Sequence, residues 1–448
     1  MTTVAVYGTG YLGATHAACM AELGHEVVGV DVDVDKLASL ADGRAPFFEP
    51  GLNEILKPHV DSGRLRFTSS YEESAEFADA HFIAVATPQK RGEFAADMTY
   101  VDSVITTLAP LLRRPTVIFG KSTVPVGSAR RLGQLASSLA PAGESVEVAW
   151  NPEFLREGFA VQDTLRPDRI VLGVDRQRPG RAEAVAREIY AQIIEHDVPF
   201  LVTDRETAEL VKTAANAFLA TKISFINAMA EVCEAAGADV TELADAIGYD
   251  ARIGRRFLNA GIGFGGGCLP KDIRAFLARA GELGANQALM FLREVDSINM
   301  RQRTSIVENV KEQLGGSLIG ARVAVLGAAF KPDSDDVRDS PALNIAGQLQ
   351  LLGASVAVYD PKANDNARRL FPTLDYATGI REASEGADII LVLTEWEEFR
   401  RLEPEYLDPL VRHRRIVDGR NCLDASRWRE AGWAYRGIGR RPDVLGIA

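Results

Sequence analysis

The fold is decided by residues 4–13, which read VAVYGTGYLG. Val4 to Tyr7 form a short apolar run typical of a buried strand, and glycines follow it. A helical pattern then continues to Leu23, with Gly24 as the expected end of the helix. A valine-rich strand is expected next, from Glu26 to Asp31. A strand, a glycine turn, a helix and a second strand in this order predict a parallel α/β unit.

Buried strands of the same kind recur along the chain in two series. The first series continues at residues 81–86, 115–121 and 146–150, and the second comprises residues 322–327, 355–360, 387–394 and 415–418. Continuous apolar strands that alternate with helical stretches indicate a sheet that is covered on both faces. The sequence therefore predicts an α/β protein with two doubly wound Rossmann-like domains.

Between the two series lies a stretch of different character, residues 205–236, which contains neither glycine nor proline. Apolar residues recur in it at helical spacing, and Asp204 can cap its start and Gly237 its end. A helix of this length, about 48 Å, typically connects domains and packs against another copy of itself. We therefore predict a homodimer. We also predict two Rossmann-like domains, residues 1–203 and 301–448, joined by a central helical dimerisation region, residues 204–300, that contains this helix and the loop of Cys268.

Composition and charge exclude several classes of protein. The 448 residues carry a net charge of -12 and give a pI near 5.2, which argues against a nucleic-acid-binding protein, because such proteins usually have a basic face. The N-terminus lacks the pattern of a signal peptide, and no stretch approaches the roughly 18 apolar residues of a membrane span. The four cysteines are scattered without metal-ligand spacing. We expect a cytoplasmic, reduced protein that holds no metal.

The first glycine turn fits the dinucleotide pattern GxGxxG through Gly8, Gly10 and Gly13. Alone the pattern is weak, but here it follows a strand, opens a helix and precedes a strand that ends in Asp31, which is the context that dinucleotide binding needs. We expect Asp31 to accept hydrogen bonds from ribose hydroxyls and to repel a 2′-phosphate, which favours NAD over NADP. The alternative is a tight turn without a ligand.

The most informative segment is residues 261–272, GIGFGGGCLPKD. Its glycines give a backbone able to fold tightly around a ligand, and Pro270 suits the first turn of the helix that follows. Cys268 is then expected at a helix N-terminus beside Lys271, a setting that makes a thiol more acidic. Asp272 falls on the same helical face and is a candidate for handling a proton or a water. The alternative, a small buried cysteine, is preferred for the other helical cysteines, Cys19 and Cys233.

Further polar residues lie in the long helix and at the ends of predicted strands. Lys212 and Asn216 are one turn apart, and as a pair they can donate to a developing oxyanion, although a lysine on a helix is usually a solvated charge. Thr123, Glu153 and Glu157 follow strand ends, where ligands bind in open α/β folds and where the alternative is a polar loop. The second series carries basic residues that suit a phosphorylated ligand: Lys331, Arg338 and Arg420.

Together these motifs resemble those of the UDP-glucose 6-dehydrogenase family over nearly the whole chain. The resemblance rests on long stretches: KSTVPVG at 121–127, NPEFLREG at 151–158, FLNAGIGFGGGCLPKD at 257–272, FKPDSDDVRDSP at 330–341 and DGRN at 418–421. The chain departs from the family pattern at Gly267, where serine is common, and in residues 89–96.

The resemblance implies roles for individual residues. It implies that Cys268 is the nucleophile and that Asp272 and Thr123 handle the catalytic water with Glu153 nearby. It also implies that Lys212 and Asn216 stabilise an oxyanion or accept the proton of the alcohol. It implies an NAD site formed by Gly8, Gly10, Tyr11, Leu12, Gly13, Asp31, Lys36, Thr87, Thr123, Glu157, Lys271 and Arg338. It implies a UDP-sugar site formed by Glu153, Phe154, Leu155, Arg156, Lys212, Asn216, Arg252, Phe257, Leu258, Asn259, Ala260, Gly261, Gly265, Lys331 and Arg420, with Arg252 reaching the site of the partner subunit.

The implied chemistry is a four-electron oxidation of UDP-glucose to UDP-glucuronate, with two NADH formed per sugar. The first oxidation gives an aldehyde, Cys268 adds to it as a thiohemiacetal, the second oxidation leaves a thioester, and water cleaves it. The alternatives are a GDP-mannose or UDP-N-acetylmannosamine dehydrogenase with the same chemistry, a β-hydroxyacid-type dehydrogenase that needs the lysine but not the cysteine, and a non-catalytic nucleotide-binding protein. The yield of NADH per substrate separates these classes of chemistry: two, one or none.

Overall fold

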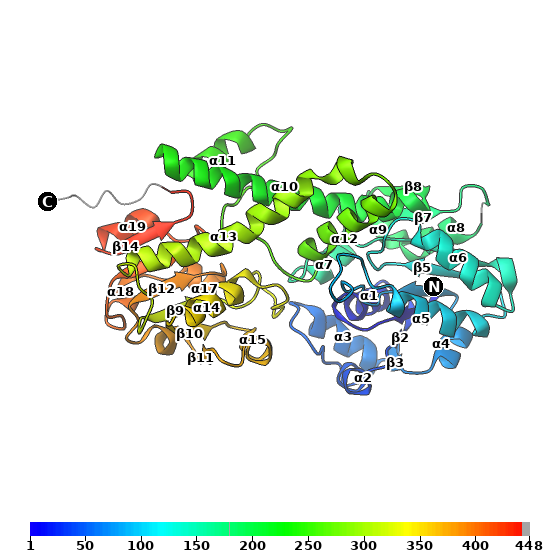
Figure 1. Ribbon diagram of the computed structural model, residues 1–448. Coiled ribbons are helices and arrows are strands. Elements are labelled where there is room, and N and C mark those ends of the chain that lie inside the picture. The colour runs from blue at the N-terminus through cyan, green and yellow to red at the C-terminus, as the bar shows by residue number, and fades with distance from the viewer. Residues whose placement is uncertain (179, 441–448) are drawn as a thin grey trace. The chain divides into compact units, whose positions relative to one another are not determined.

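The computed structural model describes residues 1–178 and 180–440. The chain folds into two compact units, the first made of residues 1–215 and 274–284 and the second of residues 216–273 and 285 onward. Two helices contribute to both units, α10 (Arg205–Ala236) and α12 (Leu269–Glu282). Both are labelled in Figure 1. Among the described residues, no helix has both the length and the apolar character needed to cross a membrane.

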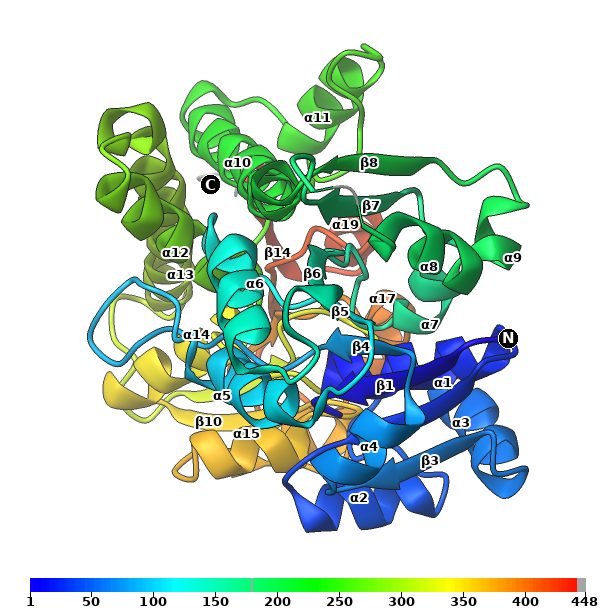
Figure 2. The ribbon, with the colours of Figure 1, turned by 90° about the vertical axis from the view of Figure 1, so that its right-hand side faces the viewer.

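Unit 1 is built on an eight-stranded sheet with the strand order β3-β2-β1-β4-β5-β6-β7-β8, which Figure 2 shows running from β3 to β8. The strands pair in parallel, except that β6 pairs with β7 in the antiparallel direction at Trp150 and Gly173. The strands are β1 (Thr3–Tyr7), β2 (Glu26–Val30), β3 (Leu65–Thr68), β4 (Ala80–Ile83), β5 (Thr116–Gly120), β6 (Val146–Trp150), β7 (Ile170–Val174) and β8 (Phe200–Asp204).

The central strands of unit 1 are buried on both faces, which explains their continuous apolar runs. Along β1, Val4 and Val6 belong to one core cluster and the alternate residues Ala5 and Tyr7 belong to another. The first cluster includes α1 and α3, and the second includes α5 and α6, so helices cover both faces of the sheet. The helices of this unit are α1 (Tyr11–Glu22), α2 (Val34–Ala41), α3 (Leu52–Asp61), α4 (Tyr71–Phe77), α5 (Thr99–Leu108), α6 (Ser128–Leu139), α7 (Ala160–Leu165), α8 (Ala182–Ile189) and α9 (Ala191–Ile194).

Unit 2 contains a six-stranded sheet with the order β11-β10-β9-β12-β13-β14, in which the strands pair in parallel. Its strands are β9 (Arg322–Leu326), β10 (Ser355–Tyr359), β11 (Asp375–Tyr376), β12 (Ile389–Val392), β13 (Arg415–Asp418) and β14 (Ala434–Gly437). Its helices are α11 (Val240–Gly248), α13 (Phe291–Gln313), α14 (Pro341–Leu351), α15 (Asn364–Leu370), α16 (Ile380–Ser384), α17 (Glu397–Arg400), α18 (Pro404–Leu407) and α19 (Ala425–Glu430). The predicted fold class, two doubly wound α/β sheets with a long central helix, is confirmed.

Helix α10 begins and ends at the predicted residues. Oδ1 of Asp204 accepts a hydrogen bond from the N–H of Thr207 at 2.8 Å, which satisfies one of the donors exposed at the helix start. Gly237 follows the last helical residue with a φ of 69°, the left-handed conformation that commonly ends a helix. The atypical residues 89–96 form a short hairpin, in which the N–H of Lys90 donates to the carbonyl of Ala95 at 2.8 Å.

Candidate active site

The glycine turn after β1 has the geometry that a dinucleotide needs. Gly8 adopts a φ of 88°, which permits the tight turn, and Gly10 is the residue before helix α1. A Cβ on Gly13 would lie 1.7 Å from the carbonyl oxygen of Gly8, whereas a Cβ on Gly10 would meet no described atom within 4 Å. Gly13 is therefore needed for packing inside the protein, and Gly10 leaves open space at the helix N-terminus. These are the roles that close approach of a pyrophosphate requires.

Asp31 lies directly after β2 and faces this turn. One of its carboxylate oxygens accepts hydrogen bonds from the N–H of Thr9 at 2.7 Å and from Nζ of Lys36 at 3.1 Å. Burial alone would raise the pKa of Asp31, but the hydrogen bonds from Thr9, Asp33 and Lys36 together lower it below its ordinary value. The carboxylate is therefore ionised and held in place, as a ribose-binding acid must be. Nearby, the Tyr11 ring stacks on Phe47 with the ring centroids 4.3 Å apart.

A buried lysine joins the loops that follow β5 and β6. Nζ of Lys121 donates to Oδ1 of Asn151 at 2.9 Å and lies 3.3 Å from the hydroxyl of Tyr190. Burial lowers the pKa of Lys121 to about 8. The hydroxyl of Thr87 donates to the carbonyl of Thr123 at 2.7 Å, so the predicted NAD residue Thr87 is tied to the same loop. Lys121 was not singled out from the sequence, although a charged residue directly after an apolar strand was a usable signal.

A second buried acid, Glu209 on α10, holds the far end of the loop that carries Thr123. Its two carboxylate oxygens each accept a hydrogen bond, one from the N–H of Gly127 and one from the N–H of Ala129, both at 2.6 Å. Burial outweighs these hydrogen bonds and raises the pKa of Glu209 to about 7. The start of α6 is thus capped by a side chain more than eighty residues away in the sequence.

Lys212 on α10 is a buried cation and not a solvated one. Its Nζ lies 3.0 Å from a carboxylate oxygen of Glu153, and the two side chains are only 7% and 13% exposed. The same ammonium lies 5.7 Å from the centre of the Phe154 ring. The other oxygen of Glu153 accepts the N–H of Leu155 at 2.7 Å. Unit 1 thus brings the predicted residues Glu153 and Lys212 into direct contact.

The neighbouring predicted residues Arg156 and Glu157 differ in their surroundings. The guanidinium of Arg156 is held by both carboxylate oxygens of Asp163, at 2.7 and 2.9 Å. Glu157 is a buried residue. In this structure Arg156 is therefore engaged with the protein itself.

In unit 2, Cys268 occupies the position before the first residue of α12. Its carbonyl accepts the N–H of Asp272 at 2.9 Å, which is the first hydrogen bond of the helix, and the residue is exposed. The helix N-terminus carries a partial positive charge that stabilises a thiolate. Cys268 therefore lies where the sequence predicted it, at the start of a helix whose first turn contains Pro270.

Asp272, one turn into α12, forms a buried cluster with two other predicted residues. One carboxylate oxygen accepts Nδ2 of Asn216 at 2.7 Å, and the other lies 2.6 Å from Nζ of Lys271. Asp272 and Asn216 are 2% and 7% exposed. The carboxylate of Asp272 is thus held by an amide and an ammonium group, one helical turn after Cys268.

The three glycines directly before Cys268 are in close contact with residues 330–341. A Cβ would lie 2.3 Å from the carbonyl oxygen of Asp339 at Gly265, 2.8 Å from the ring of Phe330 at Gly266 and 2.3 Å from Cζ of Arg338 at Gly267. The guanidinium of Arg338 is fixed by Asp336, whose carboxylate oxygens lie 2.7 and 2.8 Å from its nitrogens. Gly267, which departs from the family pattern, therefore leaves the room that Arg338 occupies.

Arg420, predicted to hold the sugar nucleotide, is bonded within the protein. Its guanidinium donates to the carbonyls of Leu393 at 2.9 Å, Gly263 at 3.1 Å and Phe330 at 3.2 Å. In this state it ties the glycine-rich loop to the ends of β9 and β12. Lys331 lies 5.5 Å from the centre of the Phe330 ring, which places it next to the same loop.

Hydrogen bonds within the protein also fix the conformation of the predicted segment 257–261. Phe257 has a φ of 67°, an unusual conformation for a residue other than glycine, and the N–H of Gly261 donates to Oδ1 of Asn227 at 2.9 Å. Oδ1 of Asn259 accepts Nη1 of Arg255 at 2.7 Å, and Leu258 and Ala260 are buried. Arg252 is different, because its side chain is 89% exposed and forms an ion pair with Asp250, at 2.6 Å.

Comparison with known proteins was made at two levels, family models and individual relatives. The models described as the NAD binding, central and UDP binding domains of the UDP-glucose/GDP-mannose dehydrogenase family match residues 2–194, 206–301 and 324–425. A UDP-glucose 6-dehydrogenase of Rhizobium meliloti is 42% identical over 440 residues, which cover 98% of this chain and 100% of that protein.

Two solved structures are similar over almost the whole chain. A UDP-glucose dehydrogenase from Pyrobaculum islandicum is 37% identical with a TM-score of 0.89, and 98% of each chain is covered. A UDP-D-ManNAc dehydrogenase from Pyrococcus horikoshii is 28% identical with a TM-score of 0.85, with 98% of this chain and 99% of the other covered.

Proposed function

The chain belongs to the UDP-glucose/GDP-mannose dehydrogenase family and is an NAD-dependent dehydrogenase, and we propose that it oxidises the C6 alcohol of UDP-glucose to a carboxylate through a thioester on Cys268. The observation that carries this proposal is the exposed thiol at the start of α12, one turn before the buried pair of Asp272 and Asn216. A nucleophile at a helix N-terminus with a fixed carboxylate beside it is suited to forming and hydrolysing an acyl intermediate.

In this proposal the cofactor is held by the turn of Gly8, Gly10 and Gly13, by Asp31 and by the remaining residues predicted for this role. Bound NAD supplies the hydride acceptor, one equivalent for each oxidation. The open space at Gly10 supports the fit, because it lies at the N-terminus of α1, where a pyrophosphate is stabilised. The ionised Asp31 supports the choice of NAD over NADP.

The protein's own groups carry the proton and acyl chemistry. Lys212, an ammonium paired with Glu153, and Asn216, an amide paired with Asp272, stabilise the oxygen of the alcohol as it loses its proton. The thiolate of Cys268 then forms a bond from sulfur to the aldehyde carbon, the carbon–oxygen double bond becomes a single bond, and its oxygen takes back the proton that the alcohol released. After the second oxidation the carbon is a thioester.

Hydrolysis completes the reaction. In this proposal Asp272 and Thr123, together with Glu153, handle the water that attacks the carbonyl carbon. The carbon–sulfur bond then breaks, and the thiol and a carboxylate are released. The UDP-sugar is held by the residues predicted for it in unit 1, by residues 257–261, and by Gly265, Lys331 and Arg420. The functional segments 1–203, 204–300 and 301–448 and the cytoplasmic location stay predictions.

Helix α10 supports the proposal of a homodimer. Phe218, Phe225 and Val232 are spaced seven residues apart and are 66%, 47% and 57% exposed, so they form one apolar stripe on the helix. A seven-residue repeat of apolar side chains is typical of a helix that packs against another helix. The exposed Arg252 supports a role across this interface, since its guanidinium can bind a diphosphate of the partner's substrate.

The alternative substrates are GDP-mannose and UDP-N-acetylmannosamine. The identities favour UDP-glucose, because the two relatives named for UDP-glucose are 42% and 37% identical and the relative named for UDP-D-ManNAc is 28% identical. The test is to measure NADH formed per sugar with each of the three sugar nucleotides and with a small β-hydroxyacid. We expect two NADH per UDP-glucose; one NADH per substrate, or turnover of another sugar nucleotide only, would overturn the proposal.

The dimer has its own test, a mixed dimer of one chain with Arg252→Ala and one with Cys268→Ala. If Arg252 acts across the interface, both lesions fall in one site, and about half of the wild-type activity survives in the other. If it acts within its own chain, each site carries one lesion and the mixed dimer is nearly inactive. A monomeric protein with full activity also contradicts the proposal.

A further inference from the structure

A pair of buried polar side chains on α13 holds the backbone of the glycine-rich loop. Oδ1 of Asn299 accepts the N–H of Phe264 at 2.7 Å, and Nδ2 of Asn299 donates to the carbonyl of Phe264 at 3.0 Å. The amide thus satisfies both backbone groups of one residue, as a neighbouring strand would do in a sheet. Phe264 lies four residues before Cys268, in the middle of the glycines.

Arg303, one helical turn after Asn299, links the same loop to residues 330–341. Its Nη2 reaches the carbonyl of Phe264 at 3.4 Å, and its Nη1 lies 2.9 Å from the carboxylate of Asp339. Asp339 has a φ of 45°, a conformation that needs outside support in a residue other than glycine, and its carbonyl contacts Gly265. The side chain of Arg303 is 3% exposed, so this guanidinium is committed to the protein.

The contact leaves the loop no room to shift toward α13. A Cβ on Gly263 would lie only 2.4 Å from Oδ1 of Asn299, so the backbone rests directly on the amide. On the other side the loop touches Phe330, Arg338 and Asp339. The loop is therefore clamped between α13 and the segment 330–341.

We propose that Asn299 and Arg303 are positioning residues that fix Cys268 for the second oxidation. This inference rests on the proposed function, in which the thiol takes no part in the first hydride transfer but must reach the aldehyde carbon before the second. Loss of the clamp should leave formation of the aldehyde nearly unchanged and slow its capture. A displacement of about 1 Å at a reacting group can cost on the order of 100-fold in rate.

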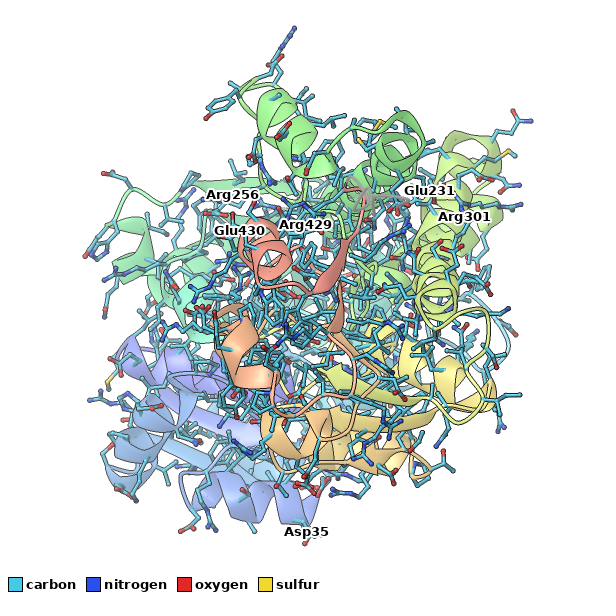
Figure 3. All side chains as sticks on the ribbon, turned by 90° about the vertical axis from the view of Figure 1, so that its left-hand side faces the viewer. Asp35, Glu231, Arg256, Arg301, Arg429 and Glu430 are labelled. Carbon is cyan, nitrogen blue, oxygen red and sulfur yellow. The ribbon has the colours of Figure 1, made fainter. Side chains whose placement is uncertain are left out.

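The experiment measures NADH per UDP-glucose in the presence of a hydrazide reagent that traps free aldehyde, with the trapped product identified by mass spectrometry. The test variants are Asn299→Ala and the milder Arg303→Lys. The matched control is Gln302→Leu, on the same helix, because Gln302 is also buried but donates to the carbonyl of Asn227 and to Glu231, which pairs with Arg301 (Figure 3). The control loses one buried and one partly buried hydrogen bond without touching residues 262–267.

We expect Asn299→Ala to release the first NADH within about twofold of the wild-type rate, to form the second at least about tenfold more slowly, and to yield between one and two NADH with trapped aldehyde. Arg303→Lys should fall between this variant and the wild type, and Gln302→Leu should give two NADH. If the wild type gives two NADH per UDP-glucose, two results overturn the positioning role. One is an equal loss of rate in both oxidations, and the other is a yield of two NADH in both test variants. A wild type that gives one NADH overturns the proposed function itself.

Discussion

In unit 1 the strands run β3-β2-β1-β4-β5-β6 before two further strands, and in unit 2 they run β11-β10-β9-β12-β13-β14, so six strands follow the same order in both sheets. The first turns of the two sheets nevertheless differ. After β1, three residues lead into α1, whereas after β9 the chain runs from Gly327 to Ser340 before α14 begins. Only the first turn presents a helix N-terminus directly at the end of the first strand, where a pyrophosphate binds.

Each sheet also has an aspartate directly after its second strand, and the two carboxylates differ in what they bind. Asp31 accepts from the N–H of Thr9 and from Lys36 and remains beside the open turn. Asp360 is 2% exposed and accepts from the backbone of Ala328, Ala329, Lys362 and Ala363 and from the indole of Trp396. The carboxylate at this topological position thus lies beside an open turn in one unit and is enclosed by backbone N–H groups in the other. Strand order alone does not assign a function.

The largest expected effect concerns Cys268, the proposed nucleophile, which lies in unit 2. Cys268→Ser should lower the rate of carboxylate formation by on the order of 1,000-fold or more, because serine is a weaker nucleophile and its ester a poorer acyl donor. The measurement is NADH per UDP-glucose and product analysis. Steady formation of two NADH per sugar by this variant would contradict the role of Cys268.

The two aspartates give the next test, because they should respond in opposite ways. Asp31→Ala should narrow the preference for NAD over NADP by about 10- to 150-fold, the value of one charge-assisted contact of about 1.5–3 kcal/mol. Its effect on the apparent Tm should be small. The measurement is the ratio of kcat/KM for the two cofactors.

Asp360→Ala is the matched variant in unit 2. It leaves several buried N–H groups without their acceptor, so we expect a loss of about 3 kcal/mol or more of stability and an unchanged cofactor ratio. A shift of the cofactor ratio in Asp360→Ala, or none in Asp31→Ala, would break the comparison between the two sheets.

Much of the fold could be predicted because the central strands are buried on both faces. The predicted strands correspond to β1, β2, β4, β5 and β6 in unit 1 and to β9, β10, β12 and β13 in unit 2. The edge strands β3, β8, β11 and β14 were not predicted, and each is only partly buried, so none carries a continuous apolar run. β7 is apolar and mostly buried, but it was not among the predicted strands. Edge strands are poorly marked in sequence because one side faces no neighbouring strand.

The positions of some candidate residues could be predicted from their spacing along one helix. Lys212 and Asn216, one turn apart, are both buried and hydrogen-bonded or ion-paired, and Cys268 begins the helix that Pro270 indicated. The residues that hold the loops were not predictable in this way. Glu209 caps a helix from 82 positions away, and Asn299 binds Phe264 from 35 positions away, so only the folded chain brings these partners together.

Two glycines in the first turn sharpen the comparison with a smaller effect. Gly10→Ala places its Cβ in open space, so the apparent Tm should stay near that of the wild type while NAD binding weakens by about tenfold. Gly13→Ala puts its Cβ 1.7 Å from the carbonyl oxygen of Gly8, so it should lower stability even without cofactor. Thermal unfolding and NAD titration separate the two. Equal losses of stability in both variants would mean that Gly10 is packed inside the protein.

The last expected effect is a dependence of the free energy of unfolding on pH, and it distinguishes how the two units hold their loops. Unit 1 uses the titratable Glu209, whereas unit 2 uses Asn299 and Arg303, which keep one charge state at ordinary pH. The pKa of Glu209 is raised from 4.5 to about 7, so between these values the folded protein binds a proton that the unfolded chain has lost. The free energy of unfolding therefore falls as the pH rises through this window, by up to about 3 kcal/mol from this group.

Glu209→Gln removes the titration, so the stability advantage of the wild type over this variant should shrink between pH 4.5 and 7. Thermal unfolding of both proteins across this range measures the difference, and Asn299→Ala, whose cost should not change with pH, is the control. A wild-type advantage over Glu209→Gln that is constant with pH would show that Glu209 titrates at its ordinary value.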